Sequence, residues 1–524
     1  MITSLRREYH AIESEFLKDK LESVRRVWRL IKELCNPKHP FHQLSPGNLA
    51  TLQHLQNETA IQSFHSKFYT PENMKCVVYG REVQQDLIEM ARLHFGKIKA
   101  KHSTVFRHHV VTEPKVYTPG NLYKWVDYQP LREGAQLDVI WPLFGASRCG
   151  VGSVIRILNQ PHSGSALSVL KKRGLATALS WSLIISTTTF SILRLNVKLT
   201  ELGKEDIWGV AKVVFNQLEI LKIDHMSTLR TRLLSIHHES LRSFINKERE
   251  PAHHFVKSLS TRMSKVLHPA YYLGPPLQPT STSCFLQTLS SLEANQSIFL
   301  FGVHLQSYPH TEPWYKIPYN AYHLYPIQLY DLSIPNHRDP DIYLPPLERY
   351  PVTRTLPLFD RDLEQSPWPS IVHQTPGLSV WWQQDSTFHL PKTDIILWVY
   401  TAHEHRTPRD VALHYLLVEM ARDQLQDKLL PAGFKIELFY QGSSGFVVTM
   451  SGYSDHDQVT RSIKELMEVL TKMELSQEER FKWVVRYQAH QEISRSDYAE
   501  AYKHPLYKSR WVYYCSFAKL LSHH

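Results

Sequence analysis

Apolar residues recur at close to helical spacing near the start of the chain, among charged residues. The recurring positions are Ile12, Leu21, Val24, Trp28 and Ile31. This period predicts one charged helix with an apolar face. The helix is expected to end before Pro37, because proline cannot continue a helix and here opens a proline-bracketed turn.

Three acidic residues of the same segment, Glu8, Glu15 and Glu22, follow one another at intervals of seven. Seven residues are close to two helical turns, so these carboxylates are predicted to share one face of the helix. A solvated acidic stripe is the simplest interpretation of such a face.

The chain after the turn alternates between helical and extended patterns. A second helix is predicted over about 49–68, a short buried strand over 75–80, and an amphipathic helix over 84–95. The apolar face of the first helix is expected to pack toward this strand, around Val77. Irregular sequence follows, with a domain boundary near residue 105, and this order of elements predicts an α+β domain.

One order of elements occurs twice: a helix, a strand, a turn, a second strand and a second helix. It is predicted between residues 163 and 222 and again between residues 410 and 473. Recurrence of one supersecondary unit at this distance suggests duplicated α+β domains. Coincidence is the alternative, because such units are common.

Prolines are dense between residues 331 and 376, and no helical or alternating pattern continues through them. This composition predicts an extended linker between two domains.

The composition is that of an ordinary globular protein, with 42% hydrophobic and 11% aromatic residues among 524. The formal net charge is +10, but the positive residues are diffuse and no nucleic-acid-binding motif accompanies them. No apolar run is long enough to span a membrane. We therefore expect no nucleic-acid partner and no membrane insertion.

The five cysteines, Cys35, Cys76, Cys149, Cys284 and Cys515, are odd in number and widely scattered. Their spacing matches neither a metal site nor a disulfide framework. This predicts a reducing compartment and favours a cytoplasmic location.

Segment 7–15 reads Arg-Glu-x-x-Ala-Ile-x-Ser-Glu, and with the turn at 36–41 it resembles the insulinase (pitrilysin-type) family of zinc metallopeptidases. The resemblance implies that Glu15 is the third zinc ligand of that family and that Glu8 is an acidic residue beside the site. A carboxylate suits the ligand role because it adds negative charge to two neutral imidazoles and leaves one position open for water. Zinc is the implied cofactor.

The family's two histidine ligands and its general base come from an upstream His-x-x-Glu-His helix. No such motif occurs in the 524 residues. Two explanations stay open: the sequence is a fragment or truncated gene model, or it is a paralogue that has lost its catalytic half-site. In either case we expect the chain alone not to catalyse, which leaves its status as an enzyme undecided.

Later segments extend the resemblance over nearly the whole chain. Residues 382–392 resemble the entry strand of the family's third domain, and residues 445–455 resemble its hairpin. The resemblance implies an α+β fold of tandem homologous domains, each a mostly antiparallel sheet packed against helices. The implied division is the end of a first, catalytic-type domain at 1–105, a second domain at 106–330, the proline-rich linker at 331–376, and an incomplete third domain at 377–524.

Segment 160–167 resembles the place in the second domain where the family anchors the N-terminal end of a substrate with a strand and a turn. Gly164 and Ser165 match the family, whereas Gln160 and His162 stand where it has histidine and glycine. Substrate anchoring by Gly164 and Ser165 is therefore one interpretation. A helix N-cap turn with a capping serine is at least as consistent with the sequence.

The resemblance implies hydrolysis of short peptides by a zinc-activated water in the complete enzyme. The alternative is a non-catalytic paralogue that binds peptides or serves as a scaffold and pairs with an active partner. The implied partners are peptide substrates, together with a second copy of the chain or another insulinase-type chain.

Overall fold

A computed structural model of the chain describes residues 2–471 apart from 53–57, 99–113, 132–133, 266–268, 270–271, 275–278, 334–338, 345–367, 386–389, 401–416, 419, 423, 426–434 and 441–444. The domain boundary expected near residue 105 lies outside the described residues, as do Cys515 and the end of the third domain.

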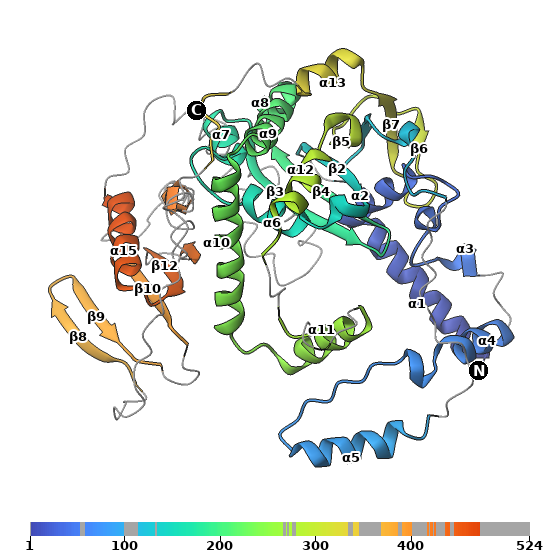
Figure 1. Cartoon of the computed structure of the whole chain (residues 1–524), viewed down its shortest axis with the longest axis horizontal. Coiled ribbons are helices and arrows are strands. Elements are labelled where there is room, and N and C mark those ends of the chain that lie inside the picture. Colours follow the sequence, from blue (N-terminus) through green and yellow to red (C-terminus); the bar gives the residue numbers. More distant parts are fainter. Residues whose placement is uncertain are drawn as a thin grey trace.

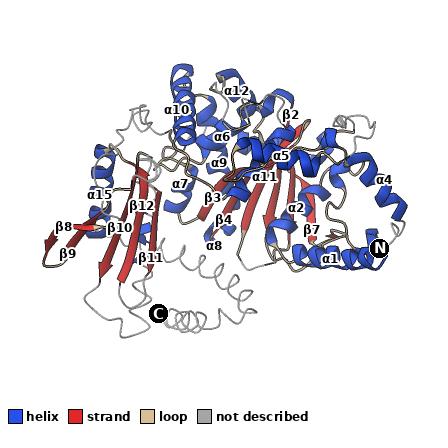
Figure 2. Cartoon of the chain, turned by 90° about the horizontal axis from the view of Figure 1, so that it is seen from below, coloured by secondary structure: helices blue, strands red, loops and turns tan. Residues whose placement is uncertain are grey.

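The centre of the described structure is a seven-stranded sheet with the order β3-β4-β2-β5-β1-β7-β6. Figure 2 shows its strands in red, with β2, β3, β4 and β7 labelled. Only β1 and β5 pair in parallel, which agrees with the mostly antiparallel sheet expected for the second domain. The strands are β1 (Lys124–Tyr128), β2 (Gln136–Phe144), β3 (Ala176–Ser186), β4 (Phe190–Leu199), β5 (Ile298–Gly302), β6 (His310–Thr311) and β7 (Pro318–His323).

Side chains of the central strands alternate between two cores on opposite faces of this sheet. On β2, Leu137, Val139 and Trp141 enter the larger core, whereas Ile140 enters the smaller one. Residues 137–143 of β2 are all buried. This explains their near-continuous apolar run, because a strand buried on both faces has no solvent side for polar residues.

Helices cover the larger core, as Figure 1 shows. Those that contribute buried apolar residues to it are α6 (Val151–Leu158), α7 (Ala166–Lys172), α9 (Ile207–Lys222), α10 (Met226–Ile245), α12 (Thr282–Ser290) and α13 (Pro326–Ser333). The shorter α8 (Glu201–Glu205) precedes α9, and α11 (Ala252–Lys265) follows α10. Short 3-10 helices lie at η1 (Pro40–His42), η3 (Pro71–Asn73), η4 (Pro119–Asn121), η5 (Gly145–Arg148) and η7 (Ala294–Gln296).

The single N-terminal helix predicted from the sequence is in fact two helices, α1 (Ile2–Lys20) and α2 (Ser23–Glu33). Glu22 lies between them with an extended backbone, φ −103° and ψ 119°. The prediction that Glu22 shares a helical face with the two earlier glutamates is therefore wrong. α2 covers the smaller core, where Leu30 and Ile31 are fully buried.

The break between α1 and α2 also changes which apolar residues are buried. Tyr9 and Phe16 are buried on α1, whereas Leu21 and Val24 are 56% and 67% exposed, contrary to the predicted apolar face. Helical spacing counted from α1 into α2 does not identify the buried face, because α2 starts a new helix with its own orientation. Trp28 is half-buried beside the aromatic ring of the 36–41 turn.

The predicted helix at 84–95 is confirmed as α5 (Gln84–Phe95). The helix expected over 49–68 is present as α3 (Leu49–Leu52) and α4 (Glu58–Phe68), with 53–57 outside the described residues. The buried strand expected at 75–80 is wrong, because this segment is irregular and mostly exposed and pairs with none of the described strands. A strand without a neighbour lacks the hydrogen bonds that stabilise it. The first helix accordingly packs toward the central sheet and not toward residue 77.

A second, three-stranded antiparallel sheet repeats part of the first. Its strands are β10 (Lys392–Tyr400), β11 (Lys435–Tyr440) and β12 (Gly445–Tyr453), and α15 (His456–Thr471) packs on it. Its order, β10-β12-β11, matches β2-β4-β3 of the first sheet. The predicted repetition of an α+β unit is therefore confirmed, although much of its first helix, expected at 410–430, lies outside the described residues.

Regular structure also occurs inside the range expected to be an irregular linker. β8 (Ser370–Thr375) forms a hairpin with β9 (Leu378–Trp382). Prolines flank β8 without interrupting it, which is compatible with a strand. Residues 339–344 have no regular structure, as expected, but they pack on the larger core, with Ile342 only 4% exposed. The expectation of irregular structure is therefore wrong at 370–375, and the boundaries 331 and 376 stay predictions.

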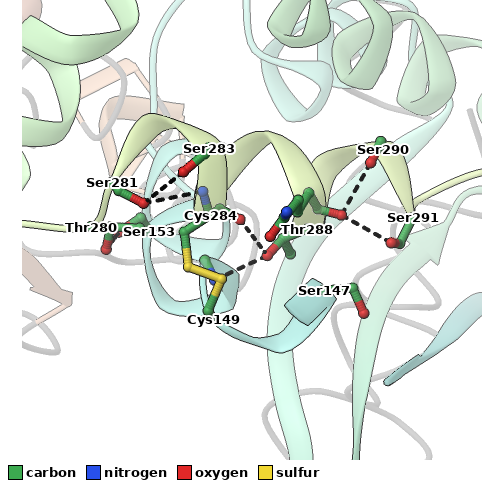
Figure 3. The surroundings of a disulfide bond; sticks show 12 residues. Ser147, Cys149, Ser153, Thr280, Ser281, Ser283, Cys284, Thr288, Ser290 and Ser291 are labelled. Atoms are coloured by element: carbon green, nitrogen blue, oxygen red, sulfur yellow. Dashed lines mark hydrogen bonds between the residues drawn. A yellow bond between two sulfur atoms is a disulfide. The ribbon is translucent and has the colours of Figure 1, made fainter. Parts of the chain in front are cut away.

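The expectation that the cysteines form no disulfide is wrong as well. Cys149 is bonded to Cys284 of α12, with the two Cα atoms 5.6 Å apart (Figure 3). The chain before α6 packs so closely on α12 that a Cβ at Gly150 would lie 2.7 Å from the Cα of Phe285. Sequence spacing could not indicate this pair, because 135 residues separate its members.

None of the helices in the described ranges combines the length and the apolar composition that a membrane span requires.

Candidate peptide-binding edge and zinc ligand

Glu8 and Glu15 lie on α1 and are both exposed, which confirms that the two share one helix with a solvated acidic face. The carboxylate of Glu8 is 3.7 Å from the guanidinium of Arg7, and both side chains are largely exposed. Such an exposed pair contributes little to stability.

The described residues do not assemble a zinc site around Glu15. No group of three or more His, Cys, Asp or Glu side chains in the described ranges could hold a metal ion. A catalytic zinc needs three protein ligands and one open position. Glu15 is therefore a single candidate ligand, and its role at a metal stays a prediction.

The free edge of β3 is a candidate surface for an extended peptide. Among the described strands, β3 stands at the end of the sheet and pairs with β4 alone. The side-chain amide of Asn159, which caps the C-terminus of α6, donates from Nδ2 to the carbonyl oxygen of Trp181 over 2.8 Å. The Asn159 Oδ1 accepts from the Trp181 N–H, also over 2.8 Å. Asn159 thus forms with the backbone of Trp181 the two hydrogen bonds that a residue of a neighbouring strand would form.

Backbone groups of alternate residues in a strand point toward the same neighbour. Leu179 and Leu183 therefore direct their N–H and C=O groups to the same open edge as Trp181. Leu183 is 41% exposed, so the edge is accessible beside Asn159. An extended peptide can add to such an edge through main-chain hydrogen bonds.

Sequence reasoning missed Asn159. A lone asparagine has no spacing that indicates a function, and its contact with β3 depends on the packing of α6 against the sheet. Its position immediately before segment 160–167 was the only available signal.

The turn that contains Gly164 and Ser165 caps α7. The Oγ of Ser165 accepts from the backbone N–H of Ser168 over 3.2 Å, and Ser165 is buried. The N-cap interpretation is therefore confirmed. This contact does not test substrate anchoring by the same residues, which stays a prediction.

Residues 339–344 of the same chain cover this turn. The N–H of Tyr343 donates to the carbonyl oxygen of Gly164 over 3.2 Å, and its hydroxyl group bonds the Oγ of Ser163. A Cβ at Gly164 would lie 2.6 Å from the Tyr343 ring, so only glycine allows this approach. The Gly164 carbonyl is therefore already engaged within the chain.

Arg173, at the end of α7, holds the covering segment in place. Its Nη1 is 2.6 Å from Asp339, and its Nη2 is 2.8 Å from Asp341. The hydrogen bond to Asp339 raises the pKa of Arg173 above its usual value. At the other end of β3, Arg148 donates a hydrogen bond to the turn between β3 and β4. Its Nη1 is 2.7 Å from the carbonyl oxygen of Thr188.

Family models match two long parts of the chain. Residues 57–229 match a model described as "Peptidase M16 inactive domain". Residues 244–519, more than half of the chain, match the "Middle or third domain of peptidase_M16".

Individual relatives agree with this assignment. The chain is 24% identical over 539 residues to "Putative zinc protease mug138" of Schizosaccharomyces pombe, a match that covers 97% of this chain and 53% of that protein. It is 22% identical over 498 residues to human "Insulin-degrading enzyme", covering 91% of this chain and 47% of that protein. The chain thus spans about half the length of these curated relatives.

The crystal structure of pitrilysin shares the fold, with a TM-score of 0.68 and 18% identity. The match covers 93% of this chain and 52% of pitrilysin. Together with the repeated α+β units and the mostly antiparallel sheets, these matches show that the chain belongs to the peptidase M16 (insulinase) family.

Proposed function

We propose that the chain provides a peptide-binding surface of an M16-type metallopeptidase and that a bound peptide adds as a strand to the free edge of β3. The observation that carries this proposal is the pair of 2.8 Å hydrogen bonds through which Asn159 takes the place of a neighbouring strand. Strand addition depends mainly on backbone groups, so it suits short peptides of varied sequence.

Asn159 competes with the peptide in this arrangement. A peptide that pairs along the whole edge displaces the amide from Trp181, and its own backbone then forms the two bonds. Asn159→Ala removes the competitor while leaving β3 paired with β4, so tighter peptide binding is the expected result.

Peptide-bond hydrolysis is proposed for the complete enzyme, with zinc as its cofactor. Glu15 would supply one ligand, and Glu8 would lie beside it as an acidic neighbour. Two imidazole ligands and a general base are also required, and the described residues do not bring them together. We propose that the cleaved peptides are short and that the enzyme acts in the cytoplasm, although the Cys149–Cys284 disulfide removes the argument for a reducing compartment that the cysteine spacing gave.

A non-catalytic role is the second candidate. The β3 edge is formed entirely by residues of this chain and needs none of the zinc ligands to bind a peptide. In this case the chain would act as a peptide-binding scaffold, either as a homo-oligomer or paired with an active insulinase-type chain.

The edge is tested by fluorescence anisotropy with labelled insulin B chain, a probe chosen because relatives are named for insulin degradation. Leu183→Pro removes one outward N–H without removing a hydrogen bond to β4. Leu183→Ala is the matched control, because it trims the same side chain and keeps the N–H. We expect Leu183→Pro to weaken peptide binding about tenfold more than Leu183→Ala. This is the loss in affinity expected when one main-chain hydrogen bond to the peptide is removed. Equal affinities of two folded variants would overturn the proposal.

Mass spectrometry of the same peptide after incubation with zinc distinguishes the two roles. Binding without cleavage supports the scaffold or an enzyme that needs a second component. Cleavage that Glu15→Gln abolishes, with peptide affinity unchanged, supports Glu15 as a ligand.

A further inference from the structure

A basic cavity of about 490 Å³ lies between α6, α10, α11 and the chain before α12. Arg156, Lys247 and Arg262 line it, together with the imidazole of His237. None of the described residues that line it is acidic. A cavity with several cations and no carboxylate attracts anions, because its walls concentrate the positive potential.

The two arginines keep their charge available to a ligand. The Nη1 of Arg156 donates to the carbonyl oxygen of Ile236 over 3.2 Å, and the Nη1 of Arg262 donates to that of Tyr272 over 3.2 Å. These neutral acceptors orient the guanidinium groups without cancelling their charge. Lys247 contributes less, because Glu250 lies 2.6 Å from its Nζ.

A disulfide forms part of the wall of this cavity. Cys149 lines the cavity and is exposed, whereas Cys284 does not line it. A thiolate attacks a disulfide in line with the S–S bond and expels the far sulfur. A thiolate in the cavity therefore meets Cys149 first, and its attack on that Sγ releases Cys284.

Cys284 is placed to leave as a thiolate. It lies in the first turn of α12, where its N–H donates to the N-cap Oγ of Ser281 over 3.2 Å. The N-terminal end of a helix stabilises negative charge, and this favours a thiolate as the group that leaves in exchange.

We propose that this cavity binds small thiols that carry carboxylate groups, and that the bound thiol undergoes thiol–disulfide exchange with the Cys149–Cys284 disulfide. The thiolate sulfur forms a new S–S bond with the Sγ of Cys149, and the bond between the two cysteines breaks. The electron pair of that bond stays on the Sγ of Cys284, which then takes a proton from water. The exchange needs no further oxidant or reductant, and it is independent of peptide binding at β3.

The test compares two thiols on the oxidised full chain, glutathione as the anionic probe and cysteamine as a cationic one. Rates of mixed-disulfide formation are measured by mass spectrometry at low salt, corrected for the thiolate fraction of each thiol. The ratio of the two rates, glutathione to cysteamine, is also measured with hydroxyethyl disulfide, a neutral disulfide that serves as the reference. We expect the rate ratio for the protein to exceed the reference ratio roughly tenfold, because a cationic site attracts the anionic thiol. Peptide mapping should place glutathione on Cys149.

Variants assign the effect to the cavity. Arg262→Gln should lower the ratio several-fold, and Arg262→Lys should restore most of it. Arg230→Gln, an exposed position on α10 outside the cavity, is the matched control and should change nothing. A ratio equal to the reference, glutathione on Cys284 instead of Cys149, or equal effects of Arg262→Gln and Arg230→Gln would each overturn the proposal. So would two free thiols at these positions in the air-oxidised protein.

Discussion

Removal of the carboxylate of Glu312 should release α2 from the central sheet. Arg29 of α2 and Glu312 form a fully buried ion pair, with side chains 3% and 0% exposed and an Nε–Oε1 distance of 2.7 Å. The second carboxylate oxygen of Glu312 accepts from the backbone N–H of Tyr315 over 2.6 Å. Both oxygens therefore have partners that water cannot replace.

The expected loss of stability in Glu312→Ala is about 3–5 kcal/mol, because the substitution leaves a buried charge without its partner. Glu33 limits the loss, since it remains 2.8 Å from Arg29. The unpaired N–H of Tyr315 adds to the loss, because a buried donor without an acceptor costs about 1–3 kcal/mol. We expect a value within the range, since these two effects oppose each other.

The assay combines urea unfolding with hydrogen exchange at the amides of α2. Asp331→Ala is the control, because Asp331 and Lys212 are 3.5 Å apart and both 49% exposed. An exposed pair of this kind contributes at most about 1 kcal/mol. If Glu312→Ala cost no more than this control, or left exchange in α2 unchanged, the reasoning would be refuted. The double variant Arg29→Met/Glu312→Leu should be more stable than Glu312→Ala, because it leaves no unpaired buried charge.

Three further results are expected. The purified chain should not retain stoichiometric zinc after dialysis against a weak chelator, because Glu15 alone gives too few ligands; retained metal in elemental analysis would contradict this. Burial lowers the pKa of Lys32 from 10.5 to about 8, so the unfolded chain binds more protons between these values and stability from this group rises with pH there. Urea unfolding at about pH 8 and about pH 10 should show that rise, and Lys32→Met should flatten it; an unchanged slope would count against the burial of this charge. Burial raises the pKa of the Cys35 thiol to about 12, so iodoacetamide should label the exposed Cys76 far faster than Cys35, and equal labelling would show that Cys35 is accessible.

Local signals in the sequence predicted local structure well. The apolar period of 84–95 gave the bounds of α5, and the serine before an apolar run indicated the cap of α7. Both features depend on residues a few positions apart. The repeated unit was also predictable, because each of its strands carries its own pattern between turn residues.

Features that depend on distant residues were not predictable. Segment 75–80 has the composition of a strand, but a strand also needs a neighbour, and composition does not reveal one. The bond between Cys149 and Cys284 and the contact of Asn159 with β3 arise from the packing of α6 against α12 and the sheet. Of the candidate residues, the sequence indicated the turn at 160–167 and Glu15, but not the edge of β3 that Asn159 bonds.

The two proposed sites lie at opposite ends of α6, and the structure predicts that they act independently. The disulfide precedes the N-terminus of α6, and Asn159 follows its C-terminus. Opening the disulfide leaves α6 held by the Gly150 N–H, which donates to the Oγ1 of Thr288 over 3.0 Å, and by fully buried apolar side chains such as Val154. Cys149→Ser/Cys284→Ser should therefore bind labelled insulin B chain with the affinity of the oxidised chain. Its melting temperature should fall, because a native disulfide typically contributes about 2–4 kcal/mol. Reduced affinity in the folded double variant would mean that the disulfide helps to position the β3 edge, whereas increased affinity would mean that it helps to hold the competing amide of Asn159 in place.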